Sequence, residues 1–288
     1  MAPSAAELDS LRPALLDGLR QLPGPWNPPP EPGESPPAAP EQPGPWNPPP
    51  EPGDPHPAPG DPHPAPGKTR AEKLHSPSLE KLADQLLSYT AELYRFNEKL
   101  GLVQAEPSEF IHAHLLDSLA PVAALPPRTA ERFGGAASLI DVGTGAGLPG
   151  IPLALAFPGL SVTLLDRAGR RCGFLRNVLA ILGRRDISII QGDLKEGSRR
   201  SEGGFDLLTA RAFHPLEPKL YGELQRILGK GGEMVLYKGR REQTEAELSS
   251  LLESLKARGE RLPEGEIREV DVPGLERERT VLLLSRFA

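Results

Sequence analysis

The feature that most constrains this chain is a glycine-rich turn, LIDVGTGAGLPG, at residues 139–150. An apolar run ends at Asp141, and Gly143, Gly145 and Gly147 then alternate with other residues. Because glycine has no side chain to block a ligand, such a turn between a buried strand and a helix forms the nucleotide pocket of Rossmann-like sheets. The sequence therefore predicts an α/β protein with a nucleotide site at this turn.

Two classes of nucleotide fit the turn. Gly145, Gly147 and Gly150 satisfy the dinucleotide pattern G-x-G-x-x-G, whereas residues 141–147 satisfy D-x-G-x-G-x-G. A pyrophosphate on a helix N-terminus gains nothing from a carboxylate at the strand end, but a carboxylate attracts the ammonium group of S-adenosylmethionine (AdoMet). Asp141 therefore favours AdoMet, and a nicotinamide dinucleotide stays open as the alternative.

Short apolar runs alternate with helical patterns after the turn, which predicts parallel βαβ units. Two last strands joined by the polar segment 273–278 indicate an antiparallel hairpin, an ending typical of AdoMet-dependent methyltransferases. We predict a Rossmann-like class I AdoMet-dependent methyltransferase fold: a mostly parallel seven-stranded sheet with an antiparallel last strand and a helical N-terminal layer. The expected strands lie near 138–142, 161–165, 187–191, 206–210, 233–238, 266–272 and 279–287, and helices near 150–157, 168–182, 215–228 and 241–258.

Two further carboxylates follow predicted strands. Asp166 ends the second strand, where an acid can accept the hydroxyls of a ribose, and Asp193 ends the third, where an adenine is commonly bound. Asp166 supports a nucleoside without choosing between AdoMet and NAD, and it can also serve as a helix N-cap.

The N-terminal quarter has a different composition from the rest. Residues 1–67 hold 23 of the 35 prolines and contain PGPWNPPPEPG twice, at 23–33 and 43–53. Such a tract cannot bury a core and is expected to be disordered. Trp26 and Trp46 lie in the two copies; they are either ligands for a proline-binding partner of residues 23–67 or, as we favour, passengers of the duplication. Around the tract we expect a short helix within 1–22, the insertion at 23–77, helices at 78–135 and an AdoMet-binding domain at 136–288.

Charge divides at the same place. Residues 1–67 carry 2 basic and 9 acidic side chains, whereas residues 68–288 carry 31 and 30, so the body is nearly neutral. A local basic face for phosphate is still possible. Basic residues that we expect near the ligand edge of the sheet are Arg167, Arg170, Arg171, Arg176, Arg184, Arg185, Arg211, Lys238, Arg240 and Arg241.

Several classes of site and location are disfavoured. A single cysteine excludes a disulfide framework, and His112 and His114, two residues apart on a predicted helix, face different directions, so we expect no metal. No segment resembles a signal peptide or a membrane span, which predicts a soluble cytoplasmic protein.

Three motifs resemble one family. DVGTGAGLPGIPL at 141–153, TARAF at 209–213 and LYKG at 236–239 are similar to those of bacterial 16S ribosomal RNA N7-guanine methyltransferases, also called glucose-inhibited division protein B. Upstream, FNEKL at 96–100 and HLLDSL at 114–119 resemble further elements of the family. The resemblance covers residues 78–288 and extends to the helix at 8–22, so that the proline tract becomes an insertion between two packed helices.

The resemblance implies both a site and a substrate. AdoMet contacts carry over onto the turn, onto the pair after the third strand and onto Arg211, while Arg211 and Lys238 are the expected catalytic residues for methylating 16S rRNA or the small ribosomal subunit as a monomer. The complete expected cofactor set is Asp141, Gly143, Gly145, Gly147, Leu148, Asp166, Asp193, Leu194, Lys195 and Arg211.

This chain departs from the family pattern mainly in the N-terminal layer. It has Phe96 where the family has tryptophan, Gly101 and Val103 where asparagine and threonine are expected, Ala113 for a basic residue, Lys195 for an acidic residue and Thr280 for histidine. Because they leave the cofactor half intact, two alternatives stay open: a related AdoMet methyltransferase with another RNA or small-molecule acceptor, and a non-catalytic AdoMet- or RNA-binding regulator.

The first prediction separates the two cofactor classes. AdoMet, added at about one hundred times its Kd, should stabilise the folded protein by about 2.7 kcal/mol, whereas NAD should leave it unchanged. Thermal-shift measurements with each ligand check this, and stabilisation by NAD alone would contradict the AdoMet assignment.

Overall fold

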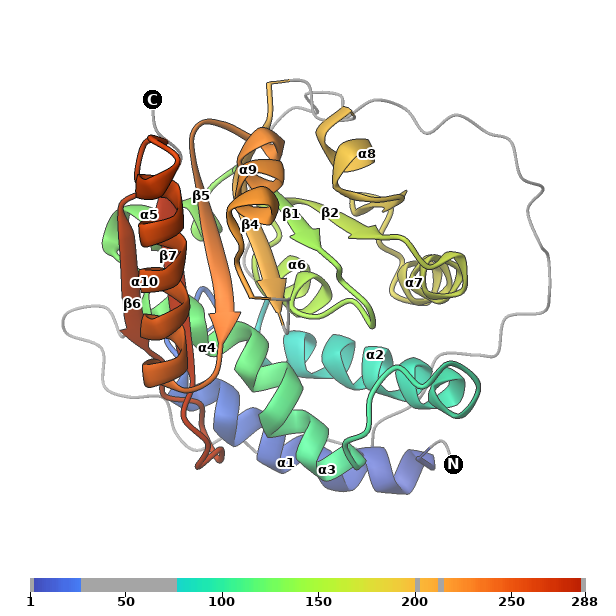
Figure 1. Cartoon of the computed structure of the whole chain (residues 1–288). Helices are drawn as coiled ribbons and strands as arrows, with labels where there is room; N and C mark the ends of the chain where they lie inside the picture. Colours follow the sequence, from blue (N-terminus) through green and yellow to red (C-terminus); the bar gives the residue numbers. More distant parts are fainter. Residues whose placement is uncertain (1–2, 27–76, 200–202, 212–214, 286–288) are drawn as a thin grey trace.

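The computed structural model describes residues 3–26, 77–199, 203–211 and 215–285 of the 288-residue chain. Its described strands form one seven-stranded sheet in the order β3-β2-β1-β4-β5-β7-β6 (Figure 1). The first five strands are parallel, while β7 pairs antiparallel with both β5 and β6. The predicted sheet and its antiparallel ending are confirmed. The strands are β1 Ser138–Val142, β2 Ser161–Asp166, β3 Ser188–Gln191, β4 Phe205–Arg211, β5 Leu228–Lys238, β6 Gly265–Glu269 and β7 Thr280–Ser285.

Helices cover both faces of the sheet because its central strands are apolar on both sides. Leu139 of β1 packs in the core beneath α6 and α7, while its neighbour Ile140 faces the second core beneath α9 and α10. Buried parallel strands read as such continuous apolar runs. The helices after β1 are α6 Gly150–Ala156, α7 Gly169–Ile181, α8 Leu194–Arg199, α9 Pro218–Ile227 and α10 Arg241–Ala257.

The predicted N-terminal helical layer is confirmed, with one difference in its geometry. Within the helices expected at 78–135, residues 107–124 form three successive segments, and the middle segment is π-helical. The N-terminal elements are α1 Ala5–Gln21, α2 Leu79–Leu100, α3 Pro107–Phe110, the π-helical segment η1 Ile111–Leu116, α4 Asp117–Ala124 and α5 Pro127–Gly134. A π-helical segment is uncommon and frequently lies at a functional site.

Helix α1 packs against α2 and η1 although most of the chain between them is the proline tract. A capping box formed by Ser4 and Glu7 begins the helix, and Arg12 makes an ion pair with Asp84 of α2. The leucines of α1 and the one directly after it are all buried: Leu8, Leu11, Leu15, Leu16, Leu19 and Leu22. Of the insertion expected at 23–77, residues 27–76 lie outside the described part of the chain.

Two buried tyrosines fix the N-terminal layer to the carboxyl edge of the sheet. The hydroxyl of Tyr89 on α2 donates to the carbonyl of Ala146 in the glycine turn at 2.8 Å, and that of Tyr237 on β5 donates to the carbonyl of Ser118 of α4 at 2.8 Å. Figure 1 shows β4 and β5 pointing toward α2 and α4. The layer therefore lies where a ligand of such a sheet would bind.

Trp26 does not behave as a passenger of the repeat, and that expectation is wrong. Its side chain is 4% exposed, its indole nitrogen donates to the carbonyl of Leu19 at 3.1 Å, and its ring meets Phe157 edge-on at 5.6 Å. Trp26 therefore joins the end of α1 to the end of α6. Trp46 lies outside the described residues.

Among the helices that the structure describes, none is long and apolar enough to span a membrane.

Replacing Trp26 by alanine should destabilise the fold by about 3–5 kcal/mol, because a buried aromatic side chain is lost. The matched control is Trp46→Ala, which removes the same residue from the second repeat and should leave the unfolding midpoint unchanged. Urea denaturation of both variants checks this, and equal midpoints would contradict the packing role of Trp26.

Candidate active site

The glycine turn is held from within by the carboxylate of Asp141. This side chain is fully buried and accepts hydrogen bonds from Thr144 Oγ1 at 2.5 Å, Gly150 N at 3.0 Å and Thr209 Oγ1 at 3.1 Å. Burial raises the pKa of Asp141 to about 6, against the effect of these donors. The turn and β4 are thus joined through one carboxylate.

This geometry gives Asp141 a role within the turn. The residue is 0% exposed and both carboxylate oxygens are bonded inside the protein, so Asp141 positions the turn. Its direct contact with AdoMet stays a prediction.

Only part of the turn is open to a ligand. Gly143 is exposed and Gly145 is partly exposed, and a side chain at Gly145 would meet only the carbonyl of Gly143, at 3.8 Å. The free space above Gly145 and the positive φ of Gly143 and Gly145 fit a nucleoside lying against the backbone. AdoMet therefore fits this side of the turn.

The other expected contacts of the turn serve packing. Gly147, Leu148 and Gly150 are buried, and a side chain at Gly150 would lie 2.4 Å from Leu164 and 2.8 Å from the Asp141 carboxylate. Gly150 thus lets α6 approach the sheet closely. The structure does not bring Gly147 or Leu148 to the open surface.

Asp166 lies next to the turn, as expected, but it too bonds the backbone. Its Oδ2 accepts from Gly145 N at 2.9 Å and its Oδ1 from Ala168 N at 2.8 Å, and the residue is 4% exposed. Asp193 is exposed and accepts from the backbone amides of Lys195 and Glu196 at the start of α8. The amide of Lys195 expected near the cofactor is therefore bonded to Asp193.

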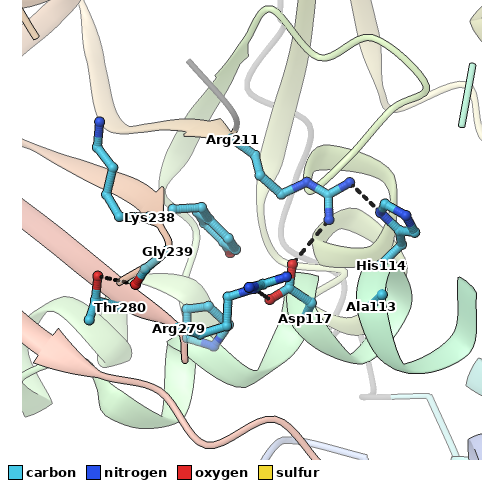
Figure 2. A pocket seen from close by; sticks show the side chains of 10 residues that line it. Ala113, His114, Asp117, Arg211, Lys238, Gly239, Arg279 and Thr280 are labelled. Atoms are coloured by element: carbon cyan, nitrogen blue, oxygen red, sulfur yellow. Dashed lines mark hydrogen bonds and ion pairs between the residues drawn. The ribbon is translucent and has the colours of Figure 1, made fainter. Parts of the chain in front are cut away.

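A pocket of about 270 Å³ opens beyond the ends of β4 and β5. Figure 2 shows that Arg211 and Arg279 converge there on Asp117, which is 4% exposed. Arg211 donates to one oxygen of Asp117 at 3.2 Å and Arg279 to the other at 2.8 Å. The lining residues are Ala113, His114, Asp117, Pro121, Arg211, Tyr237, Lys238, Gly239, Arg279 and Thr280.

His114 is a neutral member of this pocket. Its Nδ1 lies 2.8 Å from the guanidinium of Arg211, which can only donate, so the ring proton is on Nε2. Burial and the nearby Arg211, Arg279 and Arg277 lower the pKa of His114 to about 3. With His114 neutral and Lys238 paired elsewhere, two arginines against one carboxylate leave the pocket cationic.

Lys238 lines the pocket, but its ammonium group is paired outside it, and the catalytic role expected for Lys238 stays a prediction. Its ammonium makes an ion pair with Glu247 of α10 at 2.6 Å, and Glu247 also accepts from Leu216 N at 2.8 Å. Figure 2 shows the side chain pointing away from Arg211 and Asp117. Lys238 therefore holds α10 and the segment before α9 against the sheet.

Two departures in the N-terminal layer have structural explanations. Gly101 ends α2 with φ +56°, a left-handed C-cap that glycine and asparagine both tolerate. Val103 is held through its backbone, which exchanges two hydrogen bonds of 2.8 and 2.9 Å with the Asn97 side chain. Neither position depends on the expected side chain.

Thr280, another departure, is 2% exposed and donates to the carbonyl of Gly239 at 3.0 Å. It joins β7 to the end of β5 at the pocket wall.

The sequence predicted no role for Asp117, Tyr237 or Arg279, although HLLDSL contains Asp117. Two features of the sequence could have indicated the pocket: Asp117 is an acid within a predicted helix of the N-terminal layer, and Arg279 directly precedes the last strand. Among the described residues no cluster of His, Cys, Asp and Glu side chains could hold a metal ion.

Comparison with known proteins identifies relatives over most of the chain. The family model described as rRNA small subunit methyltransferase G matches residues 82–266. The chain is 38% identical over 215 residues to Ribosomal RNA small subunit methyltransferase G of Alkalilimnicola ehrlichii, covering 74% of this chain and 88% of that protein. It is 37% identical over 200 residues to the protein of the same name from Myxococcus xanthus, covering 66% and 87%.

Among solved structures, it is similar to an O-methyltransferase from Bacillus cereus in complex with SAH, with a TM-score of 0.47 and 14% identity, covering 69% of this chain and 90% of that chain.

The low pKa of His114 predicts a loss of stability in acid. Since the folded-state pKa is about 3 and the unfolded value is 6.5, the unfolded chain takes up a proton that the folded pocket resists. The stabilisation is complete above pH 6.5 and is lost as the pH falls toward 3. The free energy of unfolding should thus decrease less between about pH 7.5 and 4.5 in His114→Asn than in the wild type.

The matched control is His112→Asn, two residues away, where the ring nitrogen meets the carbonyl of Pro273 at 2.9 Å. Urea titrations at several pH values measure the difference. A wild-type pH dependence in His114→Asn would contradict the buried neutral imidazole.

Proposed function

Because this chain belongs to the rRNA small subunit methyltransferase G family, we propose that it transfers a methyl group from AdoMet to N7 of a guanine in 16S ribosomal RNA. The observation that best supports this acceptor is the pocket around Asp117, which is cationic and opens at the end of β4, the strand that pairs with β1 before the glycine turn. Its lining residues include no group prepared to remove a proton, since Asp117 is bonded by two arginines and His114 has a low pKa.

Methylation at N7 agrees with such a pocket. Guanine N7 carries a free lone pair at neutral pH, so no proton has to leave before it attacks. AdoMet, when bound, supplies a methyl group on a positively charged sulfur. The contribution of the protein is then mainly orientation and electrostatics.

We assign the residues as follows. The open backbone at Gly143 and Gly145 supports the nucleoside, with Asp166 at the ribose and the segment at Leu194 and Lys195 at the adenine. Arg211 stands between this cofactor site and the acceptor pocket, because it ends β4 and its side chain lines the pocket. Asp141 acts as a positioning residue that keeps Thr144 and Gly150 in place.

The RNA partner is 16S rRNA, free or within the small subunit, and we propose that the enzyme meets it as a monomer. Light scattering after size-exclusion chromatography tests the monomer. A proline-motif partner for the repeats is limited to the part beyond Trp26, since the Trp26 side chain is buried.

The decisive experiment incubates under-methylated small subunits with the protein and AdoMet and follows 16S rRNA by mass spectrometry. We expect new N7-methylguanosine, and its absence would refute the proposed function.

Replacing Arg211 by alanine should lower methyl transfer by roughly a hundredfold, the scale for losing a charge-stabilising donor at a reacting centre. The control is Arg268→Ala on β6, whose side chain is 40% exposed and pairs with Glu266. Transfer rates and AdoMet affinity measured together check the assignment, and if neither changes in Arg211→Ala the role of Arg211 is wrong.

A further inference from the structure

Three of the basic residues expected near the ligand edge make ion pairs with acids nearby in the chain: Arg184 bonds Asp186 in a bidentate pair, Arg241 bonds Glu245 and Lys238 bonds Glu247. Such residues have their charge largely neutralised by a neighbour. They are poor candidates for holding a further anion.

Four other basic residues lie on α7 or just before it. Arg167, Arg170 and Arg176 are exposed, and within the described ranges no carboxylate pairs with them. Arg171 lies 3.7 Å from Asp166, and its side chain is 47% exposed. α7 itself contains no acidic residue. Its solvent side therefore carries positive charge that the fold leaves uncompensated.

Four of the exposed residues of α7 form a strip along the helix, here called the arginine strip: Arg170, Gly173, Arg176 and Ala180. They recur at helical spacing, while Phe174, Leu175 and Val178 are buried on the opposite side. On this exposed side of α7, Arg170 and Arg176 thus lie on either side of Gly173, which has no side chain.

Gly173 has no packing reason to be glycine. A side chain there would meet no atom within 4 Å, and its φ is not in the left-handed region. Glycine is the least favourable ordinary residue in a helix interior, so fold stability would be served better by almost any other residue. A glycine without a packing constraint between two arginines suits close approach of a partner's backbone.

Two positive charges at the N-terminus of α7 are also unfavourable for the helix dipole. Arg170 and Arg171 lie in the first turn of α7, where the macrodipole favours anions and the helix has no acidic residue and no side-chain cap. Their presence is not explained by helix stability. An anion beside them would relieve this repulsion.

We propose that the arginine strip docks the phosphate backbone of the RNA substrate. The strip begins at the same sheet edge as the cofactor turn, because α7 follows β2 and Asp166 at the end of β2 accepts from Gly145 N. RNA that extends from the acceptor pocket across this edge would therefore meet the strip. This inference rests on the proposed function and names the surface that binds its substrate.

The test measures binding of 16S rRNA transcript over a series of salt concentrations. In Arg170→Ala/Arg176→Ala, the slope of log K against log salt should become shallower by about 1 for each phosphate that the variant no longer binds. AdoMet affinity should not change. The control with equal charge loss is Arg185→Ala/Arg268→Ala: Arg185 is exposed beyond the other end of α7, and Arg268 lies on β6 at the far edge of the sheet.

A second variant adds bulk without changing charge. Gly173→Gln should fold at least as stably as the wild type, since glutamine favours helices, yet bind the transcript several-fold more weakly. Its matched control is Gly222→Gln in α9, on the opposite face of the sheet, where an added side chain would likewise meet no atom within 4 Å. That variant should bind as the wild type does.

The inference is overturned if the strip variants keep the wild-type slope and affinity, or if the control variants weaken binding as much as the strip variants do. Failure of the proposed function is a separate result, because it appears as wild-type protein that binds the transcript but forms no N7-methylguanosine on under-methylated subunits.

Discussion

The carboxylate of Asp117 is the interaction on which the pocket depends. It is almost fully buried at the junction of η1 and α4, and it receives Arg211 from the end of β4 and Arg279 from the residue before β7. Three parts of the chain, separated by 94 and 162 residues, therefore meet at one charge. Removing a buried carboxylate leaves its arginines without a counter-ion, which is strongly destabilising in protein interiors. The N-terminal layer is thus part of the site rather than a covering for it.

A second buried carboxylate, Asp141, organises the cofactor side in the same manner. It bonds the turn at Thr144 and Gly150 and bonds β4 at Thr209, two residues before Arg211. β4 therefore connects the two carboxylates. Its residue Thr209 bonds Asp141 beneath the cofactor turn, and its residue Arg211 bonds Asp117 in the acceptor pocket. Both acids act through the groups that they position, which explains how a site for a cationic sulfonium can have acids at its base and arginines at its rim.

The sequence predicted what local periodicity determines. Strands such as 138–142 and the alternation with helices followed from apolar runs, and the antiparallel ending followed from two strands with a short polar connection. The partners of polar side chains were not predictable, because they depend on how the elements pack in three dimensions. The ammonium of Lys238 was expected at the acceptor, but it pairs with Glu247 of the following helix at 2.6 Å. Asp141 was expected at the ligand, but its depth beneath the turn depends on how closely Gly150 brings α6 to the sheet.

The same distinction between local and tertiary information applies to the repeats at the N-terminus. Composition marked PGPWNPPPEPG as unable to form a core, yet the first copy supplies Trp26 to the contact with Phe157. Only one tryptophan can occupy that contact, and in the sequence the second copy adds residues 43–53 between α1 and α2. Doubling the length of a flexible loop costs only about 0.6 kcal/mol in closure entropy. Burying one leucine of α1 contributes about 1.5–3 kcal/mol, which exceeds that cost. Packing of α1 against α2 and η1 therefore tolerates duplication within the insertion as long as Leu19 stays in α1 and Trp26 stays directly after it.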